Sequence, residues 1–103
     1  MRVFLSSNLV IGVETTNKKL IKTLETNKGF TTPDVELPNL QYYDQKCCEG
    51  VRISSIYLLE ALELIKDLPD VDRVRIFVAN LYPMIIEGKD FKIIIAPCSE
   101  VEQ

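Results

Sequence analysis

The chain has 103 residues, 47% of them hydrophobic and 26% charged, a balance that indicates one compact globular domain and excludes an intrinsically disordered chain. Its longest continuous apolar runs, such as IFVA and IIIA, are too short to cross a bilayer, and the N-terminus lacks the sustained apolar core of a secretory signal, so we expect a cytoplasmic protein. The net charge of −3 weighs against a small nucleic-acid-binding protein, whose affinity would come from Lys and Arg neutralising phosphates.

Residues 2–15 carry the first strand pattern. Five apolar residues share one parity, with Ser-Ser-Asn at 6–8 between them: Val3, Leu5, Leu9, Ile11 and Val13. Alternation of this kind predicts either two half-buried strands joined by a turn at 6–8 or one long bent strand.

A short helix is predicted at 17–27. Leu20, Ile21 and Leu24 are spaced for one helical face, Thr16 or Asn17 can cap its start, and Gly29 is placed to end it. Its exposed side is expected to carry Lys18, Lys19 and Lys22. These lysines are candidate nucleic-acid contacts, although a solvated charged face is the more common arrangement.

Residues 31–50 have two prolines, one glycine and no sustained periodicity. This composition indicates a connector with a short edge strand at about 40–43. Such a connector either offers apolar side chains to a partner or uses them to hold itself on the core. The side chains in question are Leu37, Leu40, Tyr42 and Tyr43.

The second half of the chain has the clearer pattern. Ser54 or Ser55 is expected to cap a helix at about 56–67 that Pro69 stops, with one broad apolar arc formed by Tyr57, Leu58, Ala61, Leu62, Leu64, Ile65 and Leu68. Strands are expected at about 73–79, 82–87 and 91–96, with a hairpin turn at EGKD. The prediction is a single α+β domain over residues 1–103, an antiparallel sheet with one or two helices packed on one face.

The residues of common catalytic and metal sites are missing. The chain has no histidine, no phosphate-binding glycine motif and no nucleophile motif. The acidic run at Asp67, Asp70 and Asp72 is interrupted by Pro69, which favours a polar turn over a calcium loop. We therefore expect no metal, no cofactor and no enzymatic activity.

Three cysteines, Cys47, Cys48 and Cys98, lack the spacing of a disulfide framework or a zinc site. Reduced thiols are favoured over a redox pair at 47–48. Glu100 and Glu102 near Cys98 disfavour a reactive thiolate there. An enzyme that used any of the three would need a thiol with a depressed pKa.

Four short motifs occur in the same order as in a known family: Tyr57–Leu58 in a helix, Val74–Ile76 in a strand, Pro83–Met84 in a strand, and Ala96–Pro97 followed by Glu100. Through them the second half of the chain resembles the closing segment of a DNA sliding clamp of the proliferating-cell-nuclear-antigen type. The first half has roughly the content of the remaining strands and helix of one clamp domain, or else PDVELPNL is similar to the linker between two clamp domains. These two placements exclude each other, and both stay open.

The resemblance implies a non-enzymatic processivity fold that forms rings around duplex DNA and binds hydrophobic peptides of replication or repair proteins. The implied partner-binding positions are Pro83, Ala96 and Pro97, with Tyr82, Leu37 and Leu40 as expected neighbours. The chain departs from the family in three ways. Cys98 stands where a basic residue is common, the chain has room for one domain where the family has two or three, and the 56–67 helix shows Glu60, Glu63 and Asp67 where clamps present basic residues to DNA.

Two hypotheses follow from these patterns. The first is a clamp-like protein-docking module associated with DNA replication or repair, which would form a homo-oligomer. The alternative is a small intracellular α+β regulatory or structural protein, viral or plasmid-borne, that self-associates through an edge strand, with 91–96 as the candidate strand.

Overall fold

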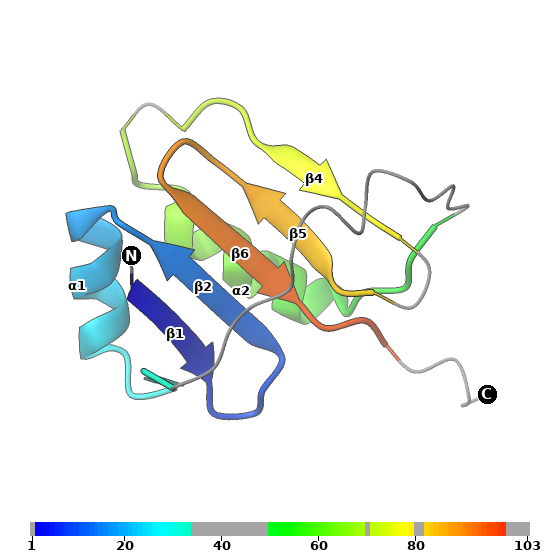
Figure 1. Cartoon of the computed structure of the whole chain (residues 1–103), viewed down its shortest axis with the longest axis horizontal. Coiled ribbons are helices and arrows are strands. Elements are labelled where there is room, and N and C mark those ends of the chain that lie inside the picture. The colour runs from blue at the N-terminus through cyan, green and yellow to red at the C-terminus, as the bar shows by residue number, and fades with distance from the viewer. Residues whose placement is uncertain (1, 34–49, 70, 80–81, 99–103) are drawn as a thin grey trace.

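The computed structural model describes residues 2–33, 50–69, 71–79 and 82–98. They form one six-stranded antiparallel sheet, in the order β3-β1-β2-β6-β5-β4, with two helices (Figure 1). The elements are β1 (Arg2–Ser6), β2 (Ile11–Thr15), α1 (Lys18–Thr26), β3 (Phe30–Thr31), α2 (Ser55–Ile65), β4 (Arg75–Phe77), β5 (Met84–Glu87) and β6 (Phe91–Ile95). The predicted α+β class is confirmed.

The N-terminal strand pattern forms a hairpin and not one bent strand. The turn is closed by a hydrogen bond from the Leu9 amide to the Ser6 carbonyl at 2.9 Å, and Leu9 adopts a left-handed φ of 64°. The predicted parity is wrong for the first strand. Because Phe4 pairs with Val13, it is Phe4, and neither of its odd-numbered neighbours, that shares the buried face with the second strand.

Helix α1 is capped by Asn17, one of the two predicted candidates. The Asn17 side chain accepts a hydrogen bond from the Leu20 amide at 2.9 Å, which satisfies one of the amides that a helix start leaves unpaired. The helix ends at Asn27, whose amide donates to the Leu24 carbonyl. Gly29 lies two residues beyond the Asn27 cap and has no left-handed φ, so the prediction that it ends the helix is wrong.

Helix α2 is capped by Ser54, whose hydroxyl accepts a hydrogen bond from the Tyr57 amide at 3.4 Å. Ala61 and Ile65 on its inner side are buried. The helix ends at Ile65, earlier than predicted, and the Leu68 amide donating to the Ile65 carbonyl at 3.1 Å makes one further turn before Pro69.

The C-terminal hairpin joins the N-terminal hairpin through β2 and β6. Register pairs such as Val13 with Ile93 place β6 between β2 and β5, in the middle of the sheet. The prediction that 91–96 is an edge strand for self-association is therefore wrong. Among the described residues the edges are β3 and β4 (Figure 1), and the edge strand predicted at 40–43 lies outside the described residues.

The two faces of the sheet differ. One face packs against the helices and holds the main core, in which a row across the strands from Phe4 through Val13 and Ile93 to Ile86 is sealed from solvent. The other face has a smaller buried cluster of Ala79, Ile85 and Ile94. Beside that cluster lies a cross-strand row of alternating charge, formed by Glu14, Lys92, Glu87 and Arg75.

Candidate functional site

Four of the six predicted partner-binding residues lie together. Strand pairing sets Met84 opposite Ile95, so the residues just before β5 and just after β6 come to the same end of the sheet. Those residues are Tyr82, Pro83, Ala96 and Pro97. Tyr82 is 37% exposed and the other three are half-buried. Leu37 and Leu40 lie outside the described residues.

The segment after β6 is held by the chain itself. The Ala96 amide donates to the Val10 carbonyl at 2.9 Å, and the Cys98 amide donates to the Arg52 carbonyl at 2.8 Å. These two amides are therefore not available to pair with an added peptide strand. A partner at this end of the sheet would have to contact side chains.

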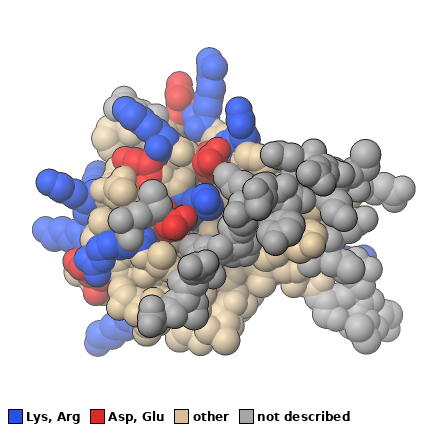
Figure 2. All heavy atoms as spheres, viewed as in Figure 1, with Lys and Arg blue, Asp and Glu red and all other residues tan. Residues whose placement is uncertain are grey.

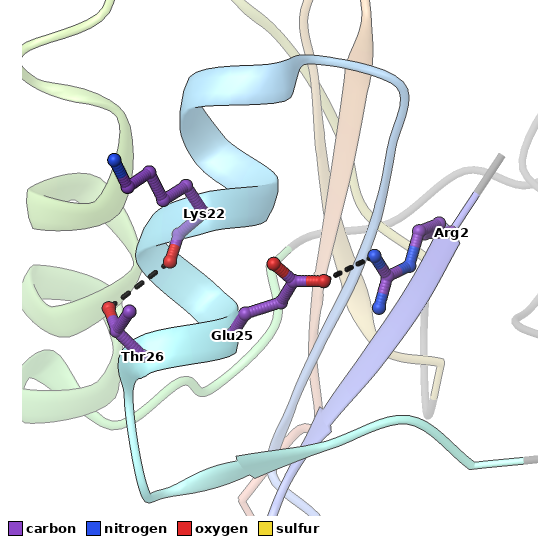
Figure 3. Close-up of polar contacts among 4 residues, drawn as sticks. All are labelled: Arg2, Lys22, Glu25 and Thr26. Atoms are coloured by element: carbon purple, nitrogen blue, oxygen red, sulfur yellow. Dashed lines mark hydrogen bonds and ion pairs between the residues drawn. The ribbon is translucent and has the colours of Figure 1, made fainter.

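The three predicted lysines lie exposed on α1. The helix also makes two polar contacts with other parts of the chain. The Lys19 ammonium donates to the Asp67 carbonyl at 3.1 Å, and Arg2 on β1 forms an ion pair with Glu25 on α1 (Figure 3). The Lys22 carbonyl accepts a hydrogen bond from the Thr26 hydroxyl at 3.1 Å, a contact within the helix (Figure 3).

Charges of both signs are interspersed over the molecule. The outer side of α2 exposes Glu60 and Glu63. Figure 2 shows Lys and Arg spread over the left and upper parts of the opposite, sheet side, with Asp and Glu among them. On the face that Figure 2 shows, the described residues therefore form no purely basic surface of the kind on which phosphate binding depends.

The turn between β5 and β6 holds a surface pocket of about 230 Å³, lined by acidic and basic side chains. One pocket residue, Asp90, makes two hydrogen bonds with side chains next to α1. Its carboxylate accepts from the Asn17 side chain at 3.0 Å, and its carbonyl accepts from the Thr15 hydroxyl at 2.8 Å. These contacts join the hairpin tip to the start of α1. Within the described residues, no group of three or more His, Cys, Asp or Glu is arranged to hold a metal ion.

Among the described residues, five of the seven exposed large hydrophobic side chains lie on α2 and at residues 74–76. We call this group the α2–β4 surface; it consists of Ile56, Leu59, Leu62, Val74 and Ile76, whose exposed fractions run from 36% to 74%. A pocket of about 280 Å³ opens at one end, between the C-terminal half of α2 and residues 71–74. Exposed apolar side chains that gather on one part of a domain often mark an interaction site.

The sequence patterns indicated this surface only in part. The helical periodicity predicts Leu62 on the core side of α2, yet its side chain is 40% exposed. Ile56 and Leu59 project from the side of α2 that carries Glu63, three residues apart and outside that arc. An apolar pair on the charged side of an amphipathic helix was the available signal.

Comparison with known proteins gives no relative: no family model, no curated protein and no solved structure matches the chain. None of the helices in the described ranges is long and apolar enough to cross a membrane.

Proposed function

We propose that this chain is a protein-interaction domain that works without catalysis and binds its partner through the α2–β4 surface. The observation that carries the proposal is the exposure of five aliphatic side chains on α2 and at residues 74–76, with Leu62 and Val74 lining one pocket.

The free energy gained by burying these five apolar side chains indicates what kind of interaction the surface supports. Full burial of one aliphatic side chain contributes about 1.5–3 kcal/mol. On average the five are about half exposed, which leaves about 1 kcal/mol per side chain, or roughly 5 kcal/mol in all, to be gained on binding. Because association itself costs several kcal/mol, this gain supports a transient complex to which polar contacts must also contribute.

A peptide-library selection tests the proposal without knowledge of the natural partner. We expect selected peptides to shift the amide NMR signals of 55–66 and 74–77, and Leu59→Asp to abolish their binding. Leu9→Asp is the matched control, because Leu9 is also an exposed leucine, 68% against 58% for Leu59, and it lies in the first turn, outside the five residues of the α2–β4 surface. Peptides that bind at other residues, or that bind the Leu59→Asp variant normally, would refute the proposed surface.

A second candidate function is the clamp-like docking module associated with DNA replication or repair. It is favoured by one observation, the clustering of Tyr82 and Pro83 with Ala96 and Pro97 at one end of the sheet. Since this chain is about one domain long, a closed ring would need about six copies. Analytical ultracentrifugation tests this directly: a single species of monomer or dimer mass contradicts the ring.

A further inference from the structure

We draw no further inference here: the strongest candidate, the apolar α2–β4 surface with the pocket at its end, belongs to the binding site already proposed, and nothing in the part of the chain that the structure describes shows what covers it.

Discussion

Substitution of Gly88 by alanine is expected to destabilise the fold, because the glycine lies against an aromatic ring. Gly88 is in the turn between β5 and β6, where its amide donates to the Phe91 carbonyl at 2.9 Å. A methyl group added at Gly88 would lie 2.3 Å from both Cε2 and Cζ of the Phe91 ring. Carbon atoms in contact are normally about 3.5–4.0 Å apart, so the ring or the turn would have to move by more than about 1 Å.

Neither movement is easy. Phe91 is 4% exposed and belongs to the main core, so a shifted ring would disturb its packing against the neighbouring aliphatic side chains. Inserting one methyl group into a packed core costs about 1–3 kcal/mol. For a domain of this size the midpoint of thermal unfolding should fall by roughly 4–8 °C for each kcal/mol lost.

Urea unfolding followed by circular dichroism measures this loss. Gly50→Ala is the matched control, because a methyl group there meets nothing within 4 Å, and its free energy of unfolding should stay within about 0.5 kcal/mol of wild type. Phe91→Leu removes the ring atoms that the methyl meets, so the penalty of Gly88→Ala should shrink in that background. A penalty that is absent in wild type, or undiminished in the Phe91→Leu background, would show that ring contact is not the cause.

Three further substitutions test the cap of α1, the first turn and the surface ion pair. Asn17→Ala should lower the free energy of unfolding by about 1 kcal/mol or more, because it removes both the α1 cap and the contact with Asp90; a change below about 0.3 kcal/mol in urea unfolding would contradict this role. Leu9→Asn should raise thermal stability by about 1 kcal/mol, because asparagine tolerates the left-handed φ better than leucine, and a lower midpoint in differential scanning calorimetry would refute that account. Arg2→Gln should cost less than about 1 kcal/mol, because both side chains of its ion pair with Glu25 are 46% exposed, and a larger loss that persists at high salt would indicate a role beyond the ion pair.

Features fixed by local sequence were predicted well. The caps at Asn17 and Ser54 and the hairpin turn at 87–90 each depend on residues within a few positions of one another, and all three appear in the structure. The polar turn after α2 likewise needs only Pro69 and its neighbours. Local chemistry sufficed because these hydrogen bonds close over short loops.

Features fixed by distant contacts were not predicted. Pairing of Val13 with Ile93 joins segments 80 positions apart, and no local pattern distinguishes a central strand rich in isoleucine from an exposed edge. The parity error in β1 arises because an even number of residues, 7–10, separates β1 from β2, so that Phe4 pairs with Val13 although one position is even and the other odd. By contrast, the position of Tyr82 and Pro83 beside Ala96 follows from the register of β5 and β6, which form a local hairpin that the sequence predicts.

The alternating pattern at β4 shows why the proposed docking surface could not be predicted from the sequence alone. Val74 and Ile76 read as residues of a buried strand face, and that is true of their equivalents on the inner strands, but β4 extends beyond α2. Because Leu59 and Ile76 are more than half exposed, they contribute little to the stability of the domain, and polar side chains would serve folding there as well. Their apolar character is therefore better explained by a partner than by the core. Since the same residues can be changed at small cost to folding, a loss of binding on substitution would report the interaction itself.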